Sequence, residues 1–137
     1  MIELKEKIKN IIEGLILDLK SFFIQEYFKN IIIIWLLILS LIANLANWIM
    51  LKLLVQSVNF PIILHYNVYF GVDLKGDYRQ IFGIPLIGLF LFLVNFILAK
   101  HVYKKGERIA CYLLLMATLM MQVNLIIYSL SIILINY

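Results

Sequence analysis

Three long runs of residues without a formal charge leave few folds open to this chain. The runs lie at about residues 31–51, 82–99 and 110–134. Each is close to the roughly 20 residues that an α-helix needs to cross about 30 Å of hydrocarbon. A soluble chain of 137 residues cannot bury so much apolar surface, because 64% of its residues are hydrophobic and its mean hydropathy is +1.00. We therefore predict an all-α integral membrane protein with three transmembrane helices, which together form one domain over residues 30–137.

The segment at about 53–80 is apolar on average but does not read as a fourth span. Polar residues and a proline interrupt it, and each unpaired polar group is costly in lipid. The interrupting residues are Gln56, Asn59, Pro61, His65 and Asn67. We predict a partly extended outer loop between the first and second spans.

Lysine and arginine are unevenly distributed around the predicted spans. Five lysines precede the first span, and Lys100, Lys104, Lys105 and Arg108 lie between the second and third. Only Lys52, Lys75 and Arg79 fall on the opposite side. Because cytoplasmic flanks are enriched in these residues, we predict a cytoplasmic N-terminus and an outer loop and C-terminus outside. The net charge of +4 is then a topology signal and does not indicate a nucleic-acid partner.

Residues 1–29 are predicted to form an amphipathic interfacial helix. The segment spreads acids and bases along its length and lacks the apolar core and small-residue cleavage site of a signal peptide, so we expect mature structure. Its apolar residues recur at spacings of three and four, which places them on one helix face. They include Leu4, Ile8, Ile12, Leu15, Leu19, Phe22 and Phe23. Such a face fits either the lipid surface or the apolar surface of a partner protein.

Polar side chains inside the spans are predicted to join the helices. Asn44 and Asn47 are three residues apart in the first span and share a helix face, which should point at another helix because a bare amide in lipid is unfavourable. We expect interhelical contacts from Asn44, Asn47, Asn95, Gln122 and Asn124, with Thr118 beside them. A polar pathway for a proton or ion is the alternative, but it normally requires ionisable groups at mid-depth, and the spans contain none.

The outer loop has a local explanation in its residue types. Pro61 ends the helical approach, β-favouring residues extend the chain from Ile62 to Phe70, and Gly71 and Gly76 permit the positive φ angles of turns. Alternation would place His65, Asn67 and Tyr69 on one face. The other face, formed by Leu64, Tyr66, Val68 and Phe70, is expected to lie on the ends of the helices.

A divalent-metal site is the alternative function for this loop. His65, Asp73 and Asp77 are metal-ligand types, and a turn at Gly71 would fold the acids back toward the imidazole. No paired-histidine or paired-cysteine spacing supports such a site, and aspartate beside glycine is common in turns. We therefore predict neither a metal nor a cofactor.

One motif in the loop resembles a known family. Pro61, His65, Asn67, Gly71 and Asp73, followed by Pro85, Gly88 and Asn95 in the next span, resemble the bacterial membrane domain of unknown function that also forms part of SdpI-type immunity proteins. Those proteins resist a secreted toxin. The resemblance covers roughly residues 53–99 and extends to the third span. It implies a bacterial cytoplasmic membrane and an outer loop that is the functional face.

The chain also departs from that family. SdpI-type proteins carry additional spans with a second domain, and the N-terminal amphipathic helix is not part of their pattern. Two functions follow as hypotheses. The first is a non-enzymatic accessory or scaffold subunit that contacts the bilayer and either another membrane protein or a second copy of itself. The second is an SdpI-like sensor or immunity protein whose outer loop binds an extracellular peptide or ion. Enzyme activity is not predicted, because Ser40, Ser129 and Ser131 lack a suitably placed base.

Overall fold

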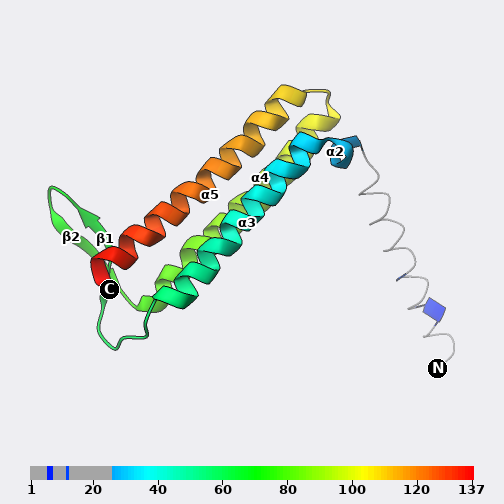
Figure 1. Cartoon of the computed structure of the whole chain (residues 1–137). Helices are drawn as coiled ribbons and strands as arrows, with labels where there is room; N and C mark the ends of the chain where they lie inside the picture. The colour runs from blue at the N-terminus through cyan, green and yellow to red at the C-terminus, as the bar shows by residue number, and fades with distance from the viewer. Residues whose placement is uncertain (1–5, 8–11, 13–25) are drawn as a thin grey trace.

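Three long helices form the body of the protein in the computed structural model, which describes residues 6–7, 12 and 26–137 (Figure 1). They are α3 (Ile31–Leu54), α4 (Gly83–Lys104) and α5 (Arg108–Asn136). All three are long and apolar enough to cross a membrane, which confirms the prediction of three such helices. The predicted interfacial helix falls almost entirely outside the described residues. Of its named apolar residues only Ile12 is described, as an exposed helical residue.

The first long helix begins where Asn30 caps it. The Asn30 side-chain oxygen accepts hydrogen bonds from the backbone N–H groups of Ile32 and Ile33 at 3.0 and 3.4 Å, which satisfies two donors that the helix leaves open. Its amide nitrogen donates to the Tyr112 hydroxyl of α5 at 2.6 Å. The short helix α2 (Glu26–Lys29) precedes this cap and buries Tyr27. One asparagine therefore both starts α3 and joins it to α5.

The second and third long helices have conventional local signals at their ends. Asp77 caps the short 3₁₀ helix η1 (Tyr78–Phe82) by accepting from the Arg79 N–H at 2.8 Å, and η1 leads directly into α4. Pro85 lies in the first turn of α4, where its missing N–H costs the helix nothing. A tight turn through Gly106, with φ of 88°, joins α4 to α5. We call this end of the bundle the turn end. We call the opposite end, where the segment between α3 and α4 forms a β-hairpin, the hairpin end.

The bundle interior consists of two apolar clusters with a polar layer between them. The cluster at the turn end contains Tyr27, Ile33, Ala99, Cys111 and Leu115. The cluster at the hairpin end contains Leu51, Ile62, Leu64, Ile81, Ile84, Ile132 and Ile133. The buried polar residues between or beside them are Ser40, Asn44, Asn47, Thr118, Gln122 and Ser129. Amide and hydroxyl groups therefore occupy the middle of the bundle, where bonds between helices are most sheltered from water.

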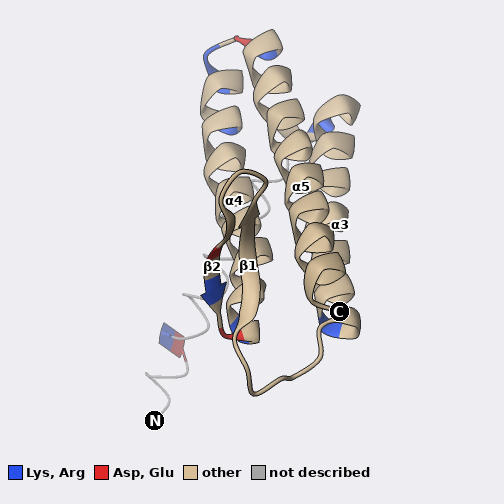
Figure 2. Ribbon diagram, turned by 90° about the vertical axis from the view of Figure 1, so that its left-hand side faces the viewer, with Lys and Arg blue, Asp and Glu red and all other residues tan. Residues whose placement is uncertain are grey.

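The segment between α3 and α4 forms an antiparallel β-hairpin. Strand β1 (Ile62–Asn67) pairs with β2 (Gly71–Gly76), and irregularities of the register fall between Ile63 and Tyr66. Figure 1 shows the hairpin at the end of the bundle, with its tip away from the helices, and Figure 2 shows that the tip points toward the turn end. Gly71 has the positive φ expected of it, at 79°. Gly76 does not. Its lack of a Cβ instead makes room for the side chains of Gln80 and Leu64.

The predicted facing of this segment is largely wrong. Leu64 is buried as expected, but Tyr66, Val68 and Phe70 are exposed and do not cover the helix ends. Two features explain the difference. The irregular register breaks strict alternation, and the chain reverses after Asn67 to pair with itself. The strand partner of β1 is therefore β2, and the helices contact mainly the first part of the hairpin.

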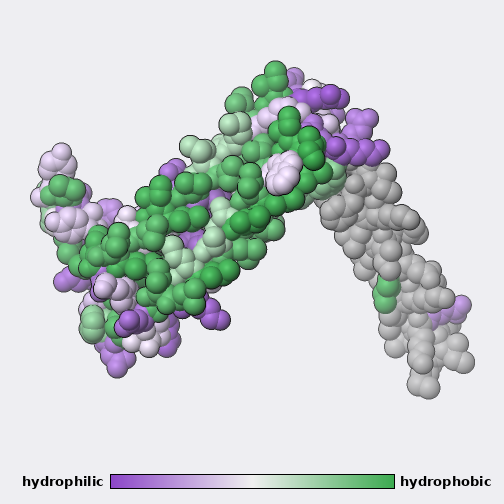
Figure 3. Space-filling model, in the orientation of Figure 1, coloured by the Kyte–Doolittle hydropathy of each residue, from purple (hydrophilic) through white to green (hydrophobic). Residues whose placement is uncertain are grey.

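The surface divides into an apolar band and two polar ends. Hydrophobic side chains cover the helices along most of their length, while polar residues gather at the two ends (Figure 3). Lys100, Lys104, Lys105 and Arg108 lie at the turn end (Figure 2). Lys52, Lys75 and Arg79 lie at the hairpin end. This arrangement is typical of a helical membrane protein whose apolar band faces lipid.

Candidate functional site

A hydrogen-bonded polar layer joins the three long helices at one level. The Asn44 amide nitrogen of α3 donates to the Gln122 side-chain oxygen of α5 at 3.1 Å and to the Pro85 carbonyl of α4 at 2.9 Å. Gln122 donates in turn to the Gly88 carbonyl of α4 at 2.8 Å. The helices approach closely here because Gly88 has no side chain. A Cβ at that position would lie 2.7 Å from the Asn44 amide nitrogen and 2.8 Å from the Gln122 oxygen.

A second pair of polar residues joins α4 to α5 toward the turn end. The Asn95 amide donates to the Thr118 hydroxyl at 2.9 Å, and that hydroxyl donates to the Leu114 carbonyl at 2.8 Å. Asn47 and Ser129 are also buried, but their polar side-chain atoms have no hydrogen-bond partner among the described residues. No Asp, Glu, Lys, Arg or His is buried in the described part of the chain. The layer therefore joins helices without the ionisable groups that a proton pathway uses.

Asn124 does not face the other helices of the bundle. The side chain is exposed on α5, and it forms no hydrogen bond to any residue that the structure describes. Successive residues of a helix are about 100° apart, so Asn124 points away from Gln122, which faces the other helices. Asn124 is 16 residues from the start of α5 and 12 from its end, which places an unpaired amide near mid-span.

The hairpin is held to α5 by residues near the end of that helix. Asn136 accepts from the Ile63 N–H and donates to the Ile63 carbonyl, each at 2.7 Å. The Tyr128 hydroxyl donates to the Leu64 carbonyl at 3.0 Å, and the Tyr137 hydroxyl donates to the Gln56 carbonyl at 3.0 Å. Sequence reasoning missed these residues. Nothing in the sequence near position 136 indicates a partner 73 residues away.

The predicted loop motif lies on the hairpin and its approach. Pro61 directly precedes β1, Asn67 and Gly71 flank the reversal, and His65 and Asp73 lie on opposite strands. With its proton on Nδ1, His65 donates to both Asp73 oxygens at 2.7 and 2.9 Å. This hydrogen bond holds the pKa of the Asp73 carboxyl below its ordinary value. Both side chains are substantially exposed to solvent.

The three metal-ligand candidates are divided between two structural roles. His65 and Asp73 bind each other, whereas Asp77 caps η1 through the Arg79 N–H. Among the described residues, no group of three or more His, Cys, Asp or Glu side chains is arranged to hold a metal ion. The hairpin therefore presents a paired histidine and aspartate rather than a set of converging ligands.

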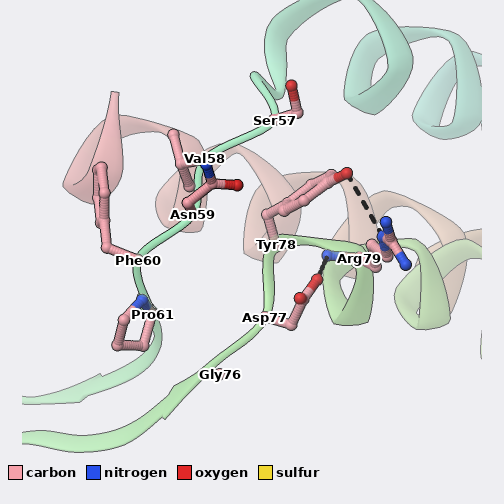
Figure 4. Close-up of a pocket in the computed structure, with 9 residues that line it drawn as sticks. All are labelled: Ser57, Val58, Asn59, Phe60, Pro61, Gly76, Asp77, Tyr78 and Arg79. Carbon is pink, nitrogen blue, oxygen red and sulfur yellow. Dashed lines mark hydrogen bonds between the residues drawn. The ribbon is translucent and has the colours of Figure 1, made fainter.

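A cavity of about 430 Å³ opens beside the hairpin, between the loop that follows α3 and the start of η1 (Figure 4). Its lining comes from residues 57–61 on one side and residues 76–79 on the other. The Arg79 Nε donates to the Tyr78 hydroxyl at 3.4 Å, and this bond raises the pKa of the guanidinium, which stays charged. The cavity thus offers one cation, Arg79, and one carboxylate, Asp77, beside aromatic and amide groups, a lining suited to noncovalent binding of a small polar group.

Comparisons of the chain with protein-family models, with curated proteins and with solved structures give no match.

Proposed function

We propose that this chain is a small non-enzymatic integral membrane protein that acts by contact with another membrane protein. The observation that carries the proposal is the unpaired amide of Asn124, exposed near the middle of α5 between the apolar side chains of Met120 and Ile127. A primary amide without a partner is unfavourable in hydrocarbon, and a polar group on a neighbouring helix would satisfy it. The bilayer alone offers no such group at that depth.

The exposed residues around Asn124 form a surface suited to a helix. Ala117, Met120, Asn124, Ile127 and Ser131 are spaced by three or four residues, and all are exposed. We call this surface the α5 face. Small residues such as Ala117 and Ser131 let two helix backbones approach closely, and an amide between them supplies a hydrogen bond. The partner is then a transmembrane helix, and a second copy of this chain is one candidate for it.

The bonds of two serine hydroxyls in the bundle support a non-enzymatic function. Ser40 and Ser131 donate to carbonyls of their own helices, those of Leu36 and Ile127, at 2.7 and 2.9 Å. These bonds are ordinary for serine within a helix. A serine nucleophile would instead need a base within hydrogen-bond reach.

Site-specific photocrosslinking in native membranes tests the proposed contact. A photoreactive residue at Met120 on the α5 face is expected to give a discrete protein adduct, whereas the same residue at Leu45, on the exposed surface of α3, is not. Ala117→Leu should reduce the adduct about tenfold or more, because the larger side chain keeps the helices apart. Ala46→Leu is the matched control, since Ala46 is also an exposed span alanine. The proposal would be contradicted if Ala117→Leu and Ala46→Leu gave equal yields of the adduct, or if the photoreactive residue at Met120 gave no adduct.

The second candidate function is a sensor or immunity protein of SdpI type. It is favoured by the cavity beside Arg79 and by the loop motif on the adjoining hairpin. The same experiment distinguishes it. A photoreactive residue at Asn59, in the cavity wall, would then capture an extracellular peptide, and the α5 face would give no adduct.

We further propose that the protein lies in the bacterial cytoplasmic membrane with the turn end in the cytoplasm. Four basic residues near that turn, against three at the hairpin end, support this orientation, together with the lysines before α3. A cysteine that replaces Lys75 should react with a membrane-impermeant maleimide on intact cells, while one that replaces Lys105 should react only after lysis. The reverse labelling pattern would show that the hairpin end lies in the cytoplasm.

A further inference from the structure

The tip of the hairpin presents large apolar side chains that the rest of the chain does not cover. Val68, Tyr69 and Phe70 are 85%, 91% and 86% exposed. The backbone there is an ordered turn, because the Asn67 side-chain oxygen accepts from the Tyr69 N–H at 2.9 Å and Gly71 supplies the positive φ. No residue from Tyr66 to Val72 carries a formal charge. The tip is therefore a fixed, uncharged and partly aromatic projection.

The contacts of β1 with α5 show which way the hairpin points. Ile63 is bound by Asn136 in the last turn of α5, whereas Leu64 is bound by the Tyr128 hydroxyl. Tyr128 precedes Asn136 by eight residues, which is about 12 Å along an α-helix. The start of β1 is thus held to the final turns of α5, and the hairpin leaves the helix toward its tip (Figure 1). Figure 1 shows the tip displaced sideways from the bundle, and Figure 2 shows it pointing toward the turn end.

This direction brings the tip toward the lipid that surrounds the bundle. The hairpin packs against Tyr128, Ile132 and Ile135 near the end of α5, a helix long and apolar enough to cross a membrane. Lipid around the bundle would therefore lie beside the hairpin. The charged residues of the hairpin lie farther from the tip. Asp73 is within β2, and Lys75 pairs with Ile63 at the base. Charge along β2 from Asp73 to the base and uncharged aromatic residues at the tip match the change from water to the membrane interface, where tyrosine is enriched.

We propose that Val68, Tyr69 and Phe70 insert into the headgroup region of the bilayer at the hairpin end. The partner is a lipid surface, and insertion does not require the contact proposed for the α5 face. The hairpin is then a second attachment to the membrane, beside the three spans. It holds the cavity near Arg79 at a fixed height above the lipid.

Fluorescence quenching in lipid nanodiscs tests this insertion on the full chain. The chain has one cysteine, the buried Cys111, so Cys111→Ala gives a background for labelling. Tyr69→Cys at the tip and Lys75→Cys at the base each receive an environment-sensitive dye. The tip dye should be quenched about threefold more strongly than the base dye by a nitroxide on the phosphatidylcholine headgroup or upper acyl chain, and less strongly by aqueous iodide.

Two outcomes would overturn the proposal. Equal quenching of both dyes by iodide would mean that the tip is in water, and protection of the tip from both quenchers would mean that protein covers it. Val68→Cys and Phe70→Cys, labelled in the same way, show whether the quenching is a property of the whole tip or only of position 69. Repeating the measurement in Ala117→Leu separates this proposal from the proposed function, because that substitution should leave tip quenching unchanged whether or not α5 binds a partner.

Discussion

Replacing Gly88 with valine is expected to lower the free energy of unfolding by about 2 to 4 kcal/mol, the sum of overpacking and of lost interhelical hydrogen bonds. A Cβ at this position would lie 2.7 to 2.9 Å from side-chain atoms of Asn44, Gln122 and Leu125, which is too close for any of them to stay in place. Flexible side chains often move aside at little cost. Here the two amides cannot do so freely, because they bond each other and carbonyls of α4 inside the bundle.

Thermal or denaturant unfolding in mild detergent measures this effect. Gly83→Val is the matched control, since Gly83 belongs to the same helix and a Cβ there would meet no atom within 4 Å. We expect Gly83→Val to change the free energy of unfolding by less than about 1 kcal/mol, the ordinary range of helix propensities. If both variants unfolded alike, the close approach at Gly88 would not be a source of stability.

Asn136→Ala is expected to release the hairpin from α5 while the bundle remains folded. The substitution removes two hydrogen bonds to Ile63, one to its N–H and one to its carbonyl. At about 0.5 to 1.5 kcal/mol each, their loss should raise the rate of amide hydrogen exchange in β1 by roughly fivefold to a hundredfold. Tyr128 would remain as a hydrogen bond between α5 and the strand.

Hydrogen exchange followed by mass spectrometry reports on the peptide that covers residues 60–78. Ser131→Ala is the control, because the Ser131 hydroxyl bonds only the Ile127 carbonyl of its own helix and no backbone group of the hairpin. Exchange in α3 and α4 should stay slow in both variants. Unchanged exchange of the hairpin in Asn136→Ala would show that other contacts hold it.

The helices were predictable from the sequence because lipid imposes a simple requirement. An apolar run of about 20 residues without charge usually forms a membrane-spanning helix, and each of the three runs forms a helix long and apolar enough to do so. It was harder to predict which amide side chains point toward the other helices. Gln122 and Asn124 are two residues apart and so project about 160° from each other around α5, which means that both cannot face the same neighbours. The sequence contained that conflict, but not which amide would be buried.

The hairpin was harder to predict because its position depends on distant residues. Residue types around Pro61 and Gly71 indicated extended chain and a turn, and a hairpin formed there. Strict alternation then failed at an irregular register between Ile63 and Tyr66. The direction of the hairpin depends on Asn136 and Tyr128 of α5, and nothing in the sequence around these residues indicates that they bind the hairpin.

The long separation between the hairpin and Asn136 sets an order of events during biosynthesis. Ile63 is made 73 residues before the side chain that binds it. At about 5 to 20 residues per second, roughly 4 to 15 s pass between their syntheses. Throughout that interval residues 62–76 lack the side chain of Asn136, which binds them in the folded protein. Docking of the hairpin through Asn136 and Tyr128 therefore has to follow the synthesis of α5.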